Sequence, residues 1–355
     1  MHFVRACCLT LSVAVCAGQS VDSRQPYTFH AYTDVVQVPT MVLTPMRASY
    51  PSLSVDSFSV SFDSGPVSHP EHVRLEGDDP LQFAVLLDVS QENGRWLAKS
   101  LVNARGQLVP ELFNGGDRIS VFASDCVLIR SREATPASIP ELHAGIKDVL
   151  ASTALHQSDQ GSNCGEKHRL WDVIASTITQ LQPLQGRRVL MVLSDGVDRG
   201  SKLTWEEVRR YAVRSGVTIM GIRPTQGGAP SSMFAPDKRQ PSKTVAEDIF
   251  AIFCGGTGGI AFYDTPKTVD STFIRAVSLI RKRYILEFVS PTNATAGDHS
   301  IDISIPDHRA IVRVTGATFL LHHQEIGEDP SVIPSNDSNA PQFGKRKILV
   351  QPQSR

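Results

Sequence analysis

The sequence predicts an α/β protein built on an open, mainly parallel sheet with helices on both faces. Two apolar runs, Phe83–Leu87 and Val189–Leu193, contain no alternation of polar and apolar residues. Strands of this kind are buried on both faces, as in parallel sheets that helices cover. Between residues 81 and 283 strand and helix patterns follow one another in turn, which indicates right-handed crossovers within one sheet. Before and after that stretch, strict alternation predicts a smaller antiparallel β region formed by the N- and C-terminal segments.

The first residues have the features of an export signal. Arg5 supplies the positive charge, Ala6–Ala17 is apolar but too short to span a bilayer, and Val15-Cys16-Ala17 offers small residues to a signal peptidase. We therefore expect a signal peptide at residues 1–18 and an exported protein, periplasmic or extracellular. A buried N-terminal strand is the alternative. No other segment has the length and apolar character of a stable membrane span.

Charge and cysteine content narrow the classes of partner and fold. The 35 Lys and Arg residues against 36 Asp and Glu leave a net charge of −1, whereas nucleic-acid binders usually carry a basic stripe. Nucleic acid is therefore not expected as a partner. Outside the signal segment Cys126, Cys164 and Cys254 remain. An oxidising compartment permits a Cys126–Cys164 bridge, two unpaired thiols being the alternative, and Cys254 is expected to be a small buried hydrophobe.

The N-terminal β region is expected at residues 19–80, because short alternating segments there are separated by prolines such as Pro39 and Pro45. The α/β domain is expected at 81–283. One of its helices begins with the capping-box pattern Thr204-Trp-Glu-Glu207. Gly255–Gly259 lacks the Lys-Ser/Thr of a phosphate loop and is interpreted as a flexible turn. The expected helices span Trp96–Val109, Ile139–Leu150, Leu170–Leu181, Thr204–Ser215, Lys243–Cys254 and Val269–Arg283.

The last part of the chain returns to the strand pattern. Segments Tyr284–Val289, His299–Ile305 and Ala310–Val314 alternate polar and apolar residues, so residues 284–324 are expected to pack as strands with the N-terminal region. Residues 325–355 are polar and rich in Pro, Asn, Ser and Gly, which predicts a disordered tail.

Acidic residues stand where the two buried strands end. Asp88 closes the first run and Asp195 follows the second, each near a serine. The carboxyl ends of parallel strands meet at one edge of a sheet, and ligands bind at that edge. The pair therefore predicts a cation site or an acid-lined ligand site. The alternative is that each aspartate only caps the helix after it.

These residues resemble the metal-dependent adhesion site of von Willebrand factor type A (VWFA) domains, whose pattern is Asp-x-Ser-x-Ser, then Thr, then Asp. Val192–Ser201 resembles in particular a secreted VWFA-related family described from acidobacteria, as do Thr257-Gly-Gly259 and Arg281-x-x-Tyr284-x-Leu286. The resemblance covers roughly residues 55 to 320. It implies that Asp88, Ser90 and Asp195 hold a divalent cation.

The sequence departs from that pattern at two places. Glu92 stands where the second Ser is expected, and the Thr position falls either on His168 or on Thr153. Oxygen ligands suit Mg or Mn, whereas His168 as a ligand would suit a transition metal. The site is thus a degenerate metal-dependent adhesion site, either altered or still able to bind a cation.

The resemblance implies an exported protein-binding or adhesion-type module that is not an enzyme, with a protein or extracellular-matrix partner that carries an acidic group. Without a cation, recognition is expected at the polar segment Ser152–Lys167. Ser194 as an acyl-transfer nucleophile is disfavoured because Val192 occupies the place of the first Gly in the nucleophile elbow. The alternatives are a cation-free structural module and a metal-dependent hydrolase that uses Asp88, Glu92, His168 and Asp195.

Overall fold

The computed structural model describes residues 35–89, 92–103, 112–125, 127–160, 169–224, 248–265, 267–289, 297–315 and 317–319. All of them belong to one compact unit, Thr33–Leu321. The expected signal peptide, the expected disordered tail and both members of the Cys126–Cys164 pair lie outside the described residues.

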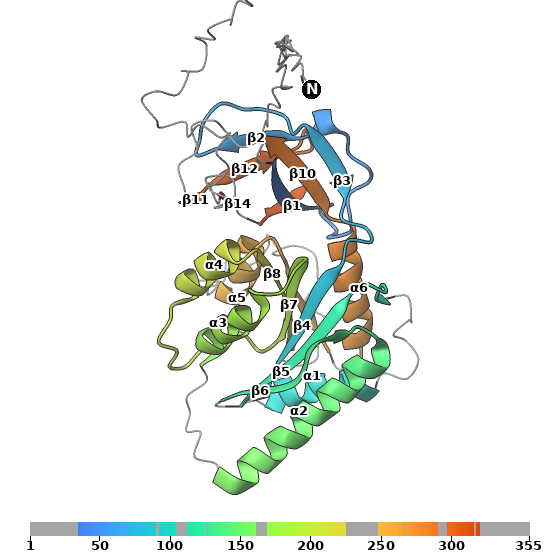
Figure 1. Cartoon of the computed structure of the whole chain (residues 1–355), viewed down its shortest axis with the longest axis vertical. Helices are drawn as coiled ribbons and strands as arrows, with labels where there is room; N and C mark the ends of the chain where they lie inside the picture. Colours follow the sequence, from blue (N-terminus) through green and yellow to red (C-terminus); the bar gives the residue numbers. More distant parts are fainter. Residues whose placement is uncertain are drawn as a thin grey trace, which may run out of the picture. The chain divides into compact units, whose positions relative to one another are not determined.

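The central sheet has six strands in the order β6-β5-β4-β7-β8-β9 (Figure 1). Neighbouring strands are parallel except β6, which forms an antiparallel hairpin with β5. The prediction of an open, mainly parallel sheet is therefore confirmed. The strands are β4 (Leu81–Asp88), β5 (Arg118–Asp125), β6 (Val127–Pro136), β7 (Arg187–Leu193), β8 (Val217–Pro224) and β9 (Ala261–Asp264).

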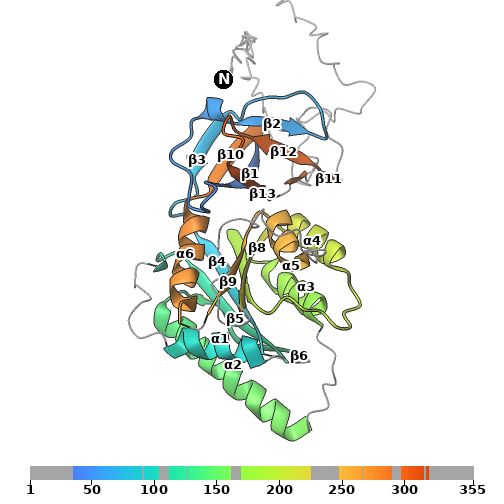
Figure 2. The same cartoon turned by 180° about the vertical axis from the view of Figure 1, so that it is seen from behind.

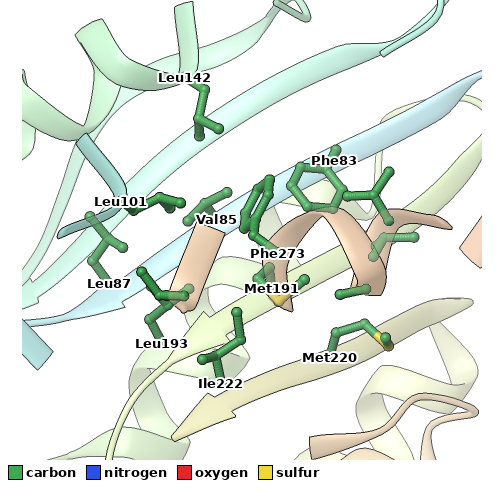
Figure 3. Packing of buried hydrophobic residues seen from close by; sticks show 14 of the residues in the cluster. Phe83, Val85, Leu87, Leu101, Leu142, Met191, Leu193, Met220, Ile222 and Phe273 are labelled. Atoms are coloured by element: carbon green, nitrogen blue, oxygen red, sulfur yellow. The ribbon is translucent and has the colours of Figure 1, made fainter. Parts of the chain in front are cut away.

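Helices cover both faces of this sheet, as predicted (Figures 1 and 2). Alternate residues of β4 point to opposite faces. Phe83, Val85 and Leu87 pack with α1, α2 and α6, as Figure 3 shows for Leu101, Leu142 and Phe273 of those helices, while Ala84 and Leu86 pack with α3, α4 and α5. The helices are α1 (Glu92–Asn103), α2 (Ile139–Gln160), α3 (Leu170–Leu181), α4 (Trp205–Arg214), α5 (Ile249–Gly256) and α6 (Val269–Arg281).

Two of the helix predictions can be compared closely with the structure. The capping box of α4 is present, because the Glu207 amide donates to Thr204 Oγ1 at 3.3 Å and the Thr204 amide donates to Glu207 Oε2 at 2.8 Å. The predicted end of α2 at Leu150 was wrong, since the helix runs to Gln160. Residues 151–160 contain neither Gly nor Pro, so nothing in them ends a helix. Much of the segment expected as a recognition loop is therefore helical.

The smaller β region unites segments from both ends of the described chain. β1 (Val35–Leu43) lies between β10 (Tyr284–Val289) and β13 (Ile311–Val314), and every pair is antiparallel, as predicted. Val38, Phe58 and Leu286 belong to its separate hydrophobic core. The remaining elements are η1 (Val55–Ser57), β2 (Ser59–Phe62), β3 (His72–Leu75), β11 (Gly297–His299), β12 (Ile301–Ser304) and β14 (Ala317–Phe319).

One expectation about the β region was wrong, because Pro39 does not interrupt its strand. It pairs with Ile285 of β10 inside β1, and its carbonyl accepts a hydrogen bond from the Thr315 amide. The pairing of β1 with β13 starts at Thr40, one residue further on. The missing amide of proline thus lies where that second ladder has not yet begun.

A buried ion pair connects the two parts of the fold. Arg283, between α6 and β10, binds Glu76 with two parallel hydrogen bonds of 2.7 and 2.8 Å. Its Nη1 donates to Thr218 Oγ1 in β8 at 2.6 Å. Both charged residues are 1% exposed. The guanidinium therefore links the β region to the central sheet at the amino end of β8.

The glycine turn after α5 is a close contact rather than the flexible turn expected. Gly258 has φ +80°, and a Cβ on it would lie 2.2 Å from Thr315 Oγ1. A Cβ on Gly259 would lie 2.0 Å from the Ile219 carbonyl oxygen. Thr257 Oγ1 accepts the Ile219 amide at 3.0 Å. Residues Thr257–Gly259 thus fit β8 and the segment after β13 where a larger residue cannot.

Candidate functional site

The site begins with a hydrogen bond between the ends of two neighbouring strands. Asp88, the last residue of β4, is 4% exposed, and Ser194, which follows β7, is 0% exposed. Ser194 Oγ donates to Asp88 Oδ2 at 2.7 Å and accepts the Gly196 amide at 3.0 Å. The chain reverses its direction of strand addition between β4 and β7. This is the switch point at which ligands bind in open α/β sheets.

Asp195 follows in a tight turn that its own side chain stabilises. Its Oδ1 accepts the Val197 amide at 2.9 Å, the Asx-turn geometry that aspartate favours. Gly196 has φ +75°, and a Cβ there would lie 2.8 Å from Phe250 Cβ. Each residue of the Ser-Asp-Gly segment thus has a structural role: Ser194 bonds Asp88, Asp195 closes the turn, and Gly196 allows the positive φ and the close approach of Phe250. Asp195 is half-buried, at the same edge of the sheet as Asp88.

The next residues fasten this loop to the start of α3. Ser201 Oγ accepts the amides of Trp171 and Asp172 at 3.1 and 3.2 Å, and so satisfies two of the free amides of that helix. In return Asp172 Oδ1 accepts the amides of Lys202 and Leu203, both at 3.0 Å. We call these four contacts the α3 clamp. It fixes the loop after Asp195 relative to the helix that begins beside the site.

The contacts of Ser201 in the α3 clamp should contribute to the stability of the fold. Ser201→Ala should lower the free energy of unfolding by about 1–2 kcal/mol, because it removes an acceptor that serves the first turn of α3 as a cap does. Ser176→Ala is the matched control, since Ser176 is exposed on the same helix and its hydroxyl donates only to the Asp172 carbonyl one turn earlier. Urea unfolding of both variants measures the difference. Equal losses would show that the clamp adds nothing.

Arg223 is a further residue of this edge that the sequence did not reveal. Its Nη1 lies 2.7 Å from Asp248 Oδ1, and its guanidinium lies 5.7 Å from the centroid of the Tyr263 ring. A Cβ on Gly196 would meet its Nε at 3.3 Å. Nothing in the sequence pattern places Arg223 near Gly196, because their proximity depends on β7 and β8 being neighbours in the sheet.

The structure places the other predicted residues as follows. Ser90 and His168 lie outside the described residues, and Glu92 opens α1 with its side chain outside them as well. Thr153 is buried in α2, where its Oγ1 donates to the Val149 carbonyl at 2.6 Å. Among the described side chains no group of three His, Cys, Asp or Glu is arranged to hold a metal ion. The structure thus relates Asp88 to Asp195 through Ser194 and leaves the complete ligand set a prediction.

Cys254 is buried in α5, as predicted. Burial raises the pKa of its thiol far above the ordinary value, with the nearby Asp248 carboxylate acting in the same direction. The burial and the raised pKa both fit the expected role of Cys254 as a small hydrophobe. In the described part of the chain, no helix combines the length and apolar character needed to cross a membrane.

The strand order, the two helix layers and the acidic switch point define a doubly wound α/β domain. No family model and no curated protein matches the chain in sequence. Among solved structures, a von Willebrand factor type A protein from Catenulispora acidiphila is 8% identical over 82% of this chain and 75% of that chain, with a TM-score of 0.41.

Two further structures are similar to the chain. Manganese-loaded TRAP protein from Plasmodium vivax is 11% identical over 68% of this chain and 95% of that one, with a TM-score of 0.34. An aerotolerance-related membrane protein from Bacteroides fragilis is 13% identical over 56% of this chain and 98% of that one, also with a TM-score of 0.34. At such identities the likeness concerns the fold alone. The closer resemblance to the acidobacterial family stays a prediction.

Proposed function

We propose that this protein is an exported binding module that recognises a partner protein at the carboxyl edge of its sheet, and that it is not an enzyme. The observation that supports this is the hydrogen bond between Asp88 and Ser194, which fixes a buried carboxylate at the switch point beside Asp195. Ser194 is 0% exposed, so its oxygen is not accessible to a substrate as that of a nucleophile would have to be.

The donors at this edge fit a hard divalent cation. Asp88 and Asp195 offer carboxylate oxygens, and Mg and Mn prefer oxygen ligands. Asp88 and Asp195, with Ser90 beside them in the sequence, are the residues that would hold the cation. A bound cation would supply a coordination position for an acidic group of the partner. The Asx turn and the α3 clamp would keep the loop of Asp195 in place while a partner binds.

A cation held by Asp88 should stabilise the fold. At a free cation concentration 100 times the dissociation constant, we expect a gain of about 2.7 kcal/mol in the free energy of unfolding. Asp88→Asn keeps an acceptor for Ser194 but removes the charge, so this gain should disappear. Thermal unfolding with chelator, and then with Mg, Mn, Ca or Zn, measures it.

Asp302→Asn is the control, because it removes one negative charge from an exposed position on β12 and should keep the gain. Identical midpoints for the unmodified protein in chelator and in excess of every cation would contradict the proposed cation site. Binding to immobilised extracellular-matrix proteins then tests the partner. We expect this binding to be lost with chelator and with Asp88→Asn, and binding that survives both would place recognition elsewhere.

A further inference from the structure

Four arginines from four segments of the chain lie near the end of α5 and the start of β9, at the amino end of the sheet. Arg47 follows β1, Arg209 lies in α4, Arg275 in α6 and Arg313 in β13. We call them the arginine cluster. A Cβ on Gly255 would lie 3.3 Å from Arg313 Cζ, and one on the adjacent Gly256 would lie 2.6 Å from Arg209 Cδ. Arg275 Nη2 donates to the Arg47 carbonyl at 2.8 Å, and Arg47 Nη1 approaches the Ala261 carbonyl at 3.4 Å.

Among the described residues, no carboxylate lies close enough to Arg47, Arg209 or Arg313 to balance its charge. Within the described part of the chain, no ion pair joins Arg47, Arg209 or Arg313 to an acidic side chain. Burial lowers the pKa of Arg313, and the charge of Arg47 lowers it further. The charged group that acts on Arg313 is thus another arginine. Several arginines elsewhere in the fold have acidic partners, namely Arg74, Arg132, Arg223, Arg281 and Arg283. Arg188 instead donates to the Leu184 and Ser215 carbonyls.

The backbone holds Arg47 in this place at a cost. Its φ of +56° is a left-handed conformation that an arginine adopts only with strain. The turn is maintained because the Arg47 amide donates to the Thr44 carbonyl at 2.8 Å and Arg275 binds the Arg47 carbonyl. A glycine would fit this φ without strain. A strained arginine next to a second unpaired arginine therefore indicates that the guanidinium itself has a use.

The partial negative charge of the carbonyls at the end of α5 accounts for only part of the positive charge gathered in the arginine cluster. A helix C-terminus carries about half a negative charge, which is less than the charge of a single arginine. Guanidinium groups bind the oxygens of sulfate and phosphate with two parallel hydrogen bonds. We propose that Arg47 and Arg313, with Arg209 beside them, form a binding site for a tetrahedral oxyanion, a sulfate or phosphate group. The site is separate from the acidic carboxyl edge and does not depend on the cation there.

Calorimetric titration with inorganic phosphate and with sulfate, at constant ionic strength, tests this proposal. We expect the unmodified protein to bind both anions and Arg313→Gln to bind them at least about 10-fold more weakly, the factor that the loss of one charge-assisted hydrogen bond produces. Arg47→Gly should show the same loss without loss of stability, because glycine relieves the left-handed turn. Arg47→Lys keeps the charge but loses the paired donors, and should bind at an intermediate level.

The control removes two positive charges from exposed positions on the β5–β6 hairpin, with Arg118→Gln and Arg130→Gln combined. This variant should bind as the unmodified protein does. A sulfated oligosaccharide distinguishes the sources of the anion: tighter binding than inorganic sulfate indicates a polymer-borne group, and equal or weaker binding indicates a free anion. The proposal is wrong if neither inorganic anion binds, or if the control loses as much affinity as Arg47→Gly and Arg313→Gln.

Discussion

Glu76→Ala is expected to lower the free energy of unfolding by about 3–5 kcal/mol, the loss typical of a buried charge whose partner has been removed. Arg283 is 1% exposed, and Glu76 accepts two of its hydrogen bonds, at 2.7 and 2.8 Å. After the substitution the guanidinium keeps its bond to Thr218 Oγ1, which is a neutral acceptor. Its charge would then stay in the interior without a carboxylate, which costs far more than the loss of one surface contact.

The double variant Glu76→Leu with Arg283→Met separates this effect from simple loss of packing. Replacing both members of a buried pair by apolar residues of similar size is often neutral, so it should recover most of the stability lost with Glu76→Ala. Glu133→Ala is the control, because its ion pair with Arg130 is exposed and should contribute about 0–1 kcal/mol. Urea unfolding measures all three. A loss for Glu76→Ala no larger than that of the control would contradict the interpretation.

The α/β core could be predicted from the sequence because its signals are local. Phe83–Leu87 and Val189–Leu193 carry the unbroken apolar pattern of strands buried on both faces, and Thr204 with Glu207 marks the start of a helix three residues apart. These patterns depend on neighbours within one element. The end of α2 was missed because polar residues alone do not end a helix, and no Gly or Pro stands between Leu150 and Gln160.

In the candidate site, too, the residues with local signals could be predicted, whereas the long-range contacts could not. Asp88 and Asp195 could be found because each follows a recognisable strand, and the ends of parallel strands share an edge. The partners of the α3 clamp could not, since Ser201 and Trp171 are 30 positions apart and meet only after α3 has packed against β4. An aspartate in the first turn of the helix, Asp172, could be recognised in the sequence, but the amides of Lys202 and Leu203 that donate to it across the loop could not.

The long-range contacts of the β region show most clearly what cannot be predicted from the sequence. Glu76 and Arg283 are 207 positions apart, so neither predicts the other. The sequence marked the Arg-x-x-Tyr phrase through its resemblance to a family, without a physical reason for it. The structure supplies that reason: Arg281 donates to the Gly77 and Asp79 carbonyls, and Arg283 binds Glu76, so the phrase fastens the end of α6 to the segment between β3 and β4.

A second substitution with a large expected effect on stability lies in the turn Thr257–Gly259. Gly259→Ala is expected to lower the free energy of unfolding by about 3 kcal/mol or more, at the upper end of overpacking costs. The new Cβ would lie 2.0 Å from the Ile219 carbonyl oxygen and 2.8 Å from its carbonyl carbon. Both atoms are backbone of β8, so the clash cannot be relieved by rotating a side chain. Either β8 or the turn has to move.

Gly115→Ala is the matched control, since a Cβ on Gly115 would meet nothing within 4 Å and its surface is exposed. It should change stability by no more than about 0.5 kcal/mol. Gly258→Ala should lower the free energy of unfolding as Gly259→Ala does, because Gly258 has φ +80° and its new Cβ would lie 2.2 Å from Thr315 Oγ1. Thermal and urea unfolding of the three variants measure the order. If Gly259→Ala unfolds at the same midpoint as Gly115→Ala, the glycines are not needed for close approach, and the turn is the flexible segment that the sequence alone suggested.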